Sequence, residues 1–208
     1  MITGAIGVSL GIAVGGTGSY AETIGSLVGL WAGLIPGAIV VCRIRATGNL
    51  VEDLGLKFKF PADWIGVVVG LGSQFVLLPI VYSLIQALSN HDLTKQLEKP
   101  AKDLTDNAHG GGFYLMAVLL VIGAPLVEEI FYRGMLLKAL KRHLPAWVSI
   151  GLCGVIFGAA HFDLVTLPGL ALFGVLLAWL SHRSGRLGPN IVAHAAFNAA
   201  TVVLLWHG

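Results

Sequence analysis

Charged side chains are scarce in this sequence. Only 12% of its 208 residues are Asp, Glu, Lys or Arg, about half the fraction in an average soluble domain, and 56% are hydrophobic. Several apolar runs approach or exceed the roughly 20 residues that a helix needs to cross a bilayer. The net charge of +2 is too small to indicate binding to nucleic acid. The composition therefore predicts an integral membrane protein, whose surroundings are the lipid bilayer.

The sequence also lacks the signatures of several hydrolytic mechanisms. Its two cysteines, Cys42 and Cys153, lie in apolar segments without a second ligand at a diagnostic spacing, so neither a disulfide nor a cysteine metal site is expected. There is no H-E-x-x-H zinc motif, no serine in a nucleophile elbow and no aspartate deep in an apolar run. Serine and aspartyl mechanisms are therefore disfavoured. The N-terminus lacks a basic region and a cleavage site, so we expect it to be retained.

What the sequence does contain is about seven long apolar segments. They lack the period-two alternation of a membrane barrel, and lipid leaves helices as the remaining choice. We find no internal repeat and no second domain, so residues 1–208 are expected to form a single integral membrane domain. Its predicted fold is all-α, a polytopic transmembrane helical bundle around a polar intramembrane cavity. The segments span roughly residues 2–15, 22–42, 63–88, 113–140, 146–162, 165–181 and 188–206, with one extended polar loop at 89–112.

Basic residues are unevenly distributed among the loops. The loops after segments two, four and six carry nine of them, whereas the 89–112 loop carries three lysines. The positive-inside rule therefore predicts a multi-pass protein of the cell membrane in which the loops after segments two, four and six lie in the cytoplasm. The nine residues are Arg43, Arg45, Lys57, Lys59, Lys138, Lys141, Arg142, Arg183 and Arg186.

Two glutamates and one arginine lie inside an apolar run, in the stretch APLVEEIFYRGML. An acid at membrane depth costs roughly 3 kcal/mol and normally faces the interior of a bundle, where it marks a functional path. Glu129 and Arg133 are four residues apart, a spacing that predicts an ion pair on one helix face. Glu128 is rotated by about 100° from Glu129 and is free to meet a neighbouring helix. The alternative is a cluster without a functional role, near a helix end, whose side chains reach the membrane surface.

Two further motifs carry polar side chains on apolar segments. FGAAHF places Phe157 and His161 four residues apart, and HAAFN does the same for His194 and Asn198. If segments four and five form a hairpin centred near residues 144–145, Glu128 and His161 reach similar depth. Each motif also has an ordinary interpretation, because a histidine at a helix end is often interfacial and an asparagine in a membrane helix often joins two helices.

Two kinds of hydrolysis fit these residues. A buried glutamate beside a histidine can activate water as a general base, while a second histidine and an asparagine can donate hydrogen bonds to an oxyanion. Alternatively, Glu128, His161 and His194 can serve as ligands of a divalent metal such as zinc. The motifs lack a closed ligand set, so no cofactor is assigned and the metal-free mechanism is favoured.

The ordered set E-E-x-x-x-R, F-x-x-x-H and H-x-x-x-N resembles the CAAX-protease and bacteriocin-processing (CPBP, or ABI) family of intramembrane proteases, which includes the type II CAAX prenyl endopeptidase. The resemblance covers roughly residues 113–206, and NLVEDLGLKFKF is also similar to a run in bacterial members. It implies that Glu128 and His161 activate water and that His194 and Asn198 form the oxyanion hole. It further implies supporting roles for Glu129 and Arg133.

The sequence thus predicts an intramembrane endopeptidase acting on a membrane-associated protein or peptide. Residues 113–206 would form its catalytic core, and residues 1–112 would supply accessory membrane segments and the polar loop. Two other functions remain open. The bundle could be a membrane immunity or scaffold protein that binds a peptide or membrane partner, or a proton-coupled transporter that uses Glu128 and the histidines as a relay. The transporter is less favoured because the chain shows no inverted repeat.

Overall fold

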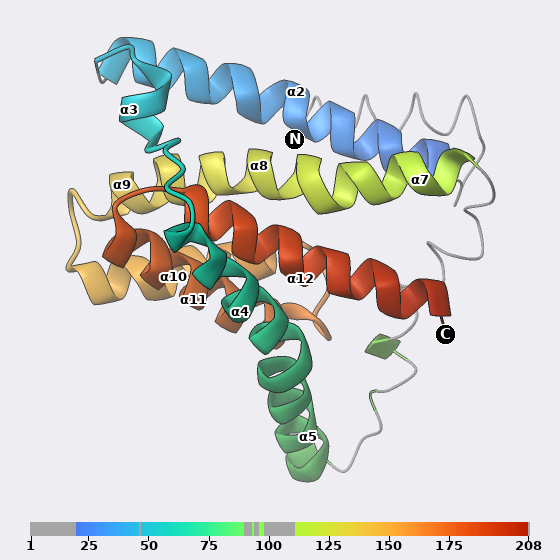
Figure 1. The fold of residues 1–208 in the computed structure, drawn as a ribbon. Helices are drawn as coiled ribbons and strands as arrows, with labels where there is room; N and C mark the ends of the chain where they lie inside the picture. The colour runs from blue at the N-terminus through green and yellow to red at the C-terminus, as the bar shows by residue number, and fades with distance from the viewer. Residues whose placement is uncertain (1–19, 46, 90–92, 94–95, 98–110, 208) are drawn as a thin grey trace.

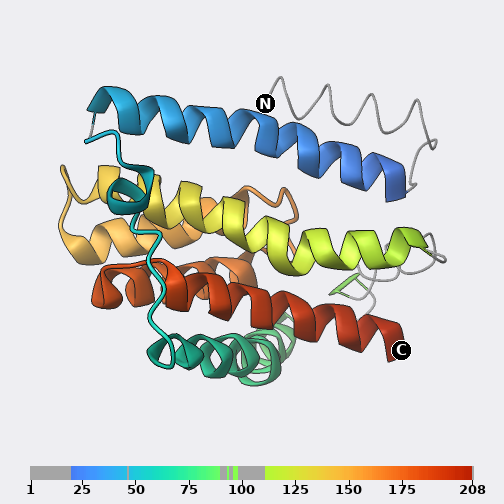
Figure 2. The same ribbon diagram turned by 45° about the horizontal axis from the view of Figure 1, so that its top comes forward.

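The computed structural model of the chain describes residues 20–45, 47–89, 93, 96–97 and 111–207. Three long helical stretches run side by side: α2, the helix that carries the two glutamates, and α12 (Figures 1 and 2). The second of these is built from α7, α8 and α9 with two π-helical turns between them, and we call it the motif helix (111–140). The α-helices are α2 (Tyr20–Arg45), α3 (Leu50–Leu54), α4 (Ile65–Gly72), α5 (Leu78–Ser89), α7 (Gly111–Val118), α8 (Ala124–Glu129), α9 (Leu137–Leu140), α10 (Ala146–Ala159), α11 (Leu167–Ser184) and α12 (Gly188–His207).

The all-α class is confirmed, and the number of spans is not. The predicted segment 2–15 lies outside the described residues, and each of the other six coincides with helix. Three described helices are long and apolar enough to cross a membrane: Ile24–Ile44, Ala62–Ser89 and Gly112–Leu140. By contrast, α10 has 14 residues, which at 1.5 Å per residue makes it about 21 Å long and shorter than the bilayer core. Three of the predicted spans are thus supported by length and composition, and the count of seven is not confirmed.

Two of the long helices widen into π-helical turns just before a proline. Ser73–Leu77 precedes Pro79, and Leu119–Gly123 precedes Pro125. Proline has no N–H group, and its ring clashes with the carbonyl four residues earlier, so a wider turn relieves the clash. The N–H of Ala124 accordingly bonds the Leu119 carbonyl, five residues back. Pro125 cannot continue that pattern, which leaves the Leu120 carbonyl without a partner in its own helix.

Helix α4 packs so closely against α12 that the two backbones are in contact. A Cβ atom on Gly66 would lie 2.4 Å from the Pro189 carbonyl oxygen, and one on Gly70 would lie 2.2 Å from that of Ala193. No larger residue fits at either position, so the G-x-x-x-G spacing of Gly66 and Gly70 permits the approach. Since Ala193 precedes His194, this contact fixes the part of α12 that carries the histidine.

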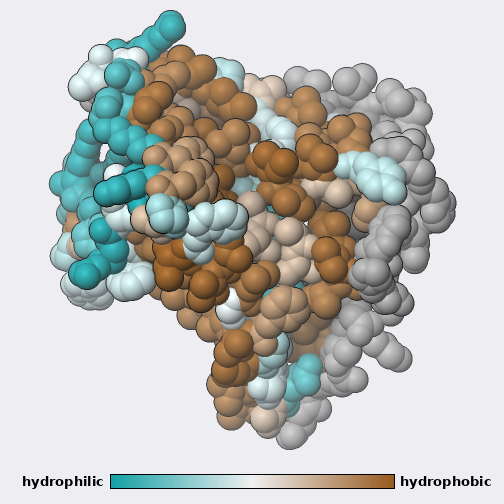
Figure 3. All heavy atoms as spheres, in the orientation of Figure 1, coloured by the Kyte–Doolittle hydropathy of each residue, from teal (hydrophilic) through white to brown (hydrophobic). Residues whose placement is uncertain are grey.

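The loop after α3 and the turn before α12 meet at one end of the bundle. The loop after α3 accepts hydrogen bonds from the start of α12, Leu187 N to Gly55 O at 2.8 Å and Gly188 N to Lys57 O at 3.2 Å. Buried Asp63 pairs with Arg186. Hydrophilic residues gather over this end, whereas the helix flanks are hydrophobic (Figure 3). The chain is thus an integral membrane protein with a polar end where the loop after α3 meets the start of α12.

The close contact of α4 with α12 predicts that alanine substitution of two glycines in the same helix will change the stability differently. Gly70→Ala should lower the free energy of unfolding in detergent by about 1–3 kcal/mol, because the new methyl group overlaps the α12 backbone. Gly72→Ala should be neutral or slightly stabilising, since nothing lies within 4 Å of its Cβ position. Equal stability of the two variants, measured by thermal denaturation, would contradict this packing.

Candidate active site

The centre of the site is the ion pair between Glu129 and Arg133. Both side chains are fully buried, and Nη1 of Arg133 donates to Oε1 of Glu129 at 2.7 Å. The pair predicted from their spacing is therefore present. Nη2 of Arg133 donates to the Gly174 carbonyl of α11 at 3.0 Å, and the guanidinium carbon lies 4.6 Å from the centre of the Phe157 ring. These contacts offset part of the desolvation of the two charges, and Glu129 Oε2 and Arg133 Nε have no hydrogen-bond partner among the described residues.

His194 approaches both glutamates from α12. Its Nδ1 lies 3.0 Å from Oε1 of Glu129, and its Nε2 lies 3.9 Å from Oε2 of Glu128. A carboxylate paired with arginine can only accept, so Nδ1 of His194 carries the proton and Glu129 fixes the orientation of the ring. The distance to Glu128 is longer than a direct hydrogen bond. Glu128 thus faces a neighbouring helix, and the helix that it meets is α12.

The hairpin register expected from the sequence is present. The Tyr132 and Phe157 rings contact each other with centroids 5.1 Å apart, and Cys153 Sγ lies 3.4 Å from the Tyr132 carbonyl oxygen. Glu128 and His161 each lie one turn further along the two arms. No hydrogen bond or ion pair joins Glu128 to His161 among the described residues. The register places the two residues at one level, and the rotation of each arm decides what their side chains touch.

Phe157 links the two histidines of the site. Its buried ring lies 5.0 Å from the ring of His161 and 5.6 Å from that of His194, centroid to centroid. His161 follows the end of α10, where its Nδ1 lies 2.9 Å from the Phe157 carbonyl oxygen. A carbonyl accepts only, so Nδ1 of neutral His161 is the protonated nitrogen and Nε2 is left as a proton acceptor.

Asn198 completes the polar face of α12, one turn beyond His194. Its Nδ2 donates to the Leu120 carbonyl at 2.8 Å, the group that Pro125 leaves without a partner in the motif helix. The amide is therefore held in a fixed orientation by the π-helical turn. The NH₂ group has two N–H bonds, so one remains for another acceptor.

The proposed metal ligands are not brought together. Within the described ranges, no group of three His, Cys, Asp or Glu side chains is arranged to hold a metal ion. Glu128, His161 and His194 are thus not grouped as metal ligands in the described part of the chain, and no chemical step is assigned to a metal.

Sequence reasoning missed the contribution of α11. Phe173 lies 5.6 Å from the His194 ring and stacks on Phe197 at 4.2 Å, centroid to centroid, and the carbonyl of Gly174 accepts from Arg133. Gly174 also brings α11 against α10, since a Cβ atom there would lie 2.9 Å from Gly154. A backbone carbonyl leaves no trace in the residue type, and the G-x-x-x-G spacing of Gly154 and Gly158 was the signal for this close packing.

Comparisons with known proteins agree with the position of these motifs. Residues 110–200 match the model of the type II CAAX prenyl endopeptidase Rce1-like family. Over 90 residues the chain is 31% identical to the "Putative membrane peptidase YdiL" of Bacillus subtilis (strain 168), a match that covers 43% of this chain and 37% of that relative. No solved structure matches the chain. Residues 110–200, which contain all three motifs, are thus similar to the type II CAAX prenyl endopeptidase Rce1-like family, and the chain spans well under two thirds of the length of the curated relative that it matches.

Proposed function

We propose that the chain is an intramembrane endopeptidase that hydrolyses a peptide bond of a membrane-associated protein or peptide. The observation that carries the proposal is the convergence of Glu128 and Glu129 on the His194 ring inside a helical bundle. The proposal assigns residues 113–206 to the catalytic core and residues 1–112 to accessory segments. It places the end of the bundle with the basic loops in the cytoplasm.

Glu128 is the proposed general base. Its Oε2 is buried and has no hydrogen-bond partner among the described residues, so it is available to accept a proton from a water molecule. The carboxylate takes that proton while the water oxygen bonds to the substrate carbonyl carbon. His161 is assigned to positioning the same water because of its depth, with its Nε2 accepting a hydrogen bond from the O–H bond that the water keeps. The protonated carboxyl of Glu128 then gives the proton to the leaving amine when the C–N bond breaks.

His194 and Asn198 are the proposed donors to the oxyanion. The NH₂ group of Asn198 retains one N–H bond beside its hydrogen bond to Leu120. His194 donates from Nε2 in the form of its ring that carries a proton on each nitrogen. Donors held in place before the reaction stabilise the developing negative charge without reorganisation. Glu129 and Arg133 act by holding His194.

The role of Glu128 predicts loss of cleavage without loss of fold. Glu128→Gln keeps the shape of the side chain and removes the base, so cleavage of membrane-embedded reporter peptides should fall by about 10²–10⁴-fold. Glu52→Gln, the same change at an exposed residue of α3, should leave cleavage unchanged. Both variants should unfold at the temperature of the wild type. Equal cleavage by Glu128→Gln and wild type would disprove the assignment. A folded wild type that cleaves no peptide in a broad panel would favour a binding or scaffold protein.

The role of Arg133 predicts loss of stability that a second substitution restores. Arg133→Met leaves Glu129 as a buried charge held only by His194, and it should cost about 3–5 kcal/mol of unfolding free energy in detergent. Adding Glu129→Gln removes the uncompensated charge, so the double variant should be more stable than Arg133→Met alone. A double variant no more stable than the single one would mean that packing on Phe157, rather than charge, dominates.

Chelation tests the metal-free mechanism. Because the three candidate ligands do not form a metal-binding group, treatment of the purified protein with a chelator should leave the rate of reporter cleavage unchanged. Elemental analysis accompanies the assay. Zinc bound at one atom per chain, lost together with activity and restored on adding zinc, would overturn the mechanism while leaving the endopeptidase assignment intact.

A further inference from the structure

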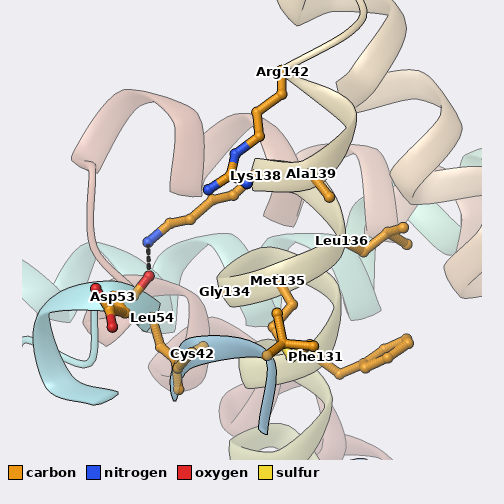
Figure 4. Close-up of a pocket in the computed structure, with 11 residues that line it drawn as sticks. Cys42, Asp53, Leu54, Phe131, Gly134, Met135, Leu136, Lys138, Ala139 and Arg142 are labelled. Carbon is orange, nitrogen blue, oxygen red and sulfur yellow. Dashed lines mark hydrogen bonds between the residues drawn. The ribbon is translucent and has the colours of Figure 1, made fainter. Parts of the chain in front are cut away.

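A pocket of about 310 Å³ lies between α2, α3 and one face of the motif helix (Figure 4). The motif helix contributes Phe131, Met135 and Lys138, and Arg142 lies in the turn that follows it. Neither Glu129 nor Arg133 lines the pocket, because both side chains are directed toward α11 and α12. The pocket is therefore separate from the candidate active site.

The lining of the pocket is amphipathic. Val41, Leu54, Phe131 and Met135 supply apolar walls, and Lys138 and Arg142 lie together at one end (Figure 4). Nζ of Lys138 donates to the Asp53 carbonyl at 2.8 Å, which uses one of its three N–H bonds. The guanidinium of Arg142 has no hydrogen-bond or ion-pair partner in the described part of the chain. The pocket thus offers unused donors of positive charge beside an apolar surface.

Asp53 is the one acid in the lining, and its carboxylate is already occupied. It accepts from Thr47 N at 3.2 Å, Thr47 Oγ1 at 2.8 Å and Gly48 N at 2.9 Å. Desolvation raises the pKa of Asp53, but these hydrogen bonds and the charge of Lys138 lower it more, so the pKa lies below its ordinary value. Asp53 therefore stays ionised, satisfied within its own loop, and the two cations leave the lining with a net positive charge.

The pocket lies at the edge of the membrane. The membrane-spanning stretch of the motif helix ends at Leu140 and that of α2 at Ile44, so Lys138, Arg142 and Val41 all lie near the ends of spans. Phosphate headgroups occupy this depth, with acyl chains directly below. Basic pockets between helices on the cytoplasmic side are suited to anionic headgroups.

We propose that this pocket binds an anionic phospholipid. The phosphate pairs with Lys138 and Arg142, and the first part of an acyl chain lies along Phe131 and Met135. Apolar walls of this extent are not needed for a free phosphate, and the basic end is not needed for a neutral lipid. The ligand class follows from the combination of the two.

Native mass spectrometry of the full chain in detergent tests the proposal, with dioleoyl phosphatidylglycerol, dioleoyl phosphatidylcholine and glycerol phosphate as three separate probes. Phosphatidylglycerol should bind in preference to the other two. Arg142→Gln should weaken its binding about fivefold. Arg183→Gln is the matched control, since Arg183 is exposed at the end of α11 and lines no part of the pocket; it should leave binding unchanged.

A second variant tests the apolar part independently of charge. Ala139 is exposed and lines the pocket, so Ala139→Phe fills space without burying a new group in the core, and it should also weaken phosphatidylglycerol binding. Equal effects of Arg142→Gln and Arg183→Gln would show general attraction to basic residues and overturn the site. If glycerol phosphate binds as tightly as phosphatidylglycerol, the pocket is a phosphate site and the lipid assignment is overturned. Equal binding of phosphatidylcholine would overturn the preference for an anionic lipid.

Discussion

The ion pair of Glu129 and Arg133 is the interaction on which the arrangement of the helices around it depends. Two charges removed from water are stable only when both are paired and hydrogen-bonded. One helix cannot supply those partners, so Arg133 takes a carbonyl from α11 and a ring face from α10, and Glu129 takes a histidine from α12. Burial of the pair therefore requires four helices to supply groups at one level of the bundle. Glu128, one residue away, takes no part in the ion pair, and its Oε2 has no hydrogen-bond partner among the described residues.

The close helix contacts and the polar contacts depend on each other. Gly66 and Gly70 let α4 hold α12 at a fixed height, and Gly174 lets α11 approach α10. A hydrogen bond of 3.0 Å between His194 and Glu129 tolerates little sliding of α12 along the motif helix. Small residues outside the site therefore set distances inside it. The hydrogen bonds from Leu187 and Gly188 to the loop after α3 fix the same helix at its polar end.

Local features of the site could be predicted from the sequence, and features that depend on helix rotation could not. Spacing within one helix sufficed for the Glu129–Arg133 pair, and equal arm lengths about residues 144–145 sufficed for the contact of Tyr132 with Phe157. The partner of Glu128 depends on how α12 is turned, which periodicity in an all-apolar helix does not specify. Likewise, apolar content predicted α10 as a span because composition does not record where a helix ends. The count of seven spans is not confirmed by the described helices, and the roles assigned to the residues of the three motifs stay predictions.

The carbonyl of Leu120 depends on a helix that is synthesised later in the chain. The motif helix enters the membrane before α12 has been made, and its π-helical turn then exposes a carbonyl that Pro125 cannot satisfy. In hydrocarbon such a group costs several kcal/mol, so the newly inserted helix carries an unmet acceptor together with two buried carboxylates. Asn198 and His194 supply the missing partners from a single face of α12. The polar centre is therefore incomplete until α12 packs against the motif helix.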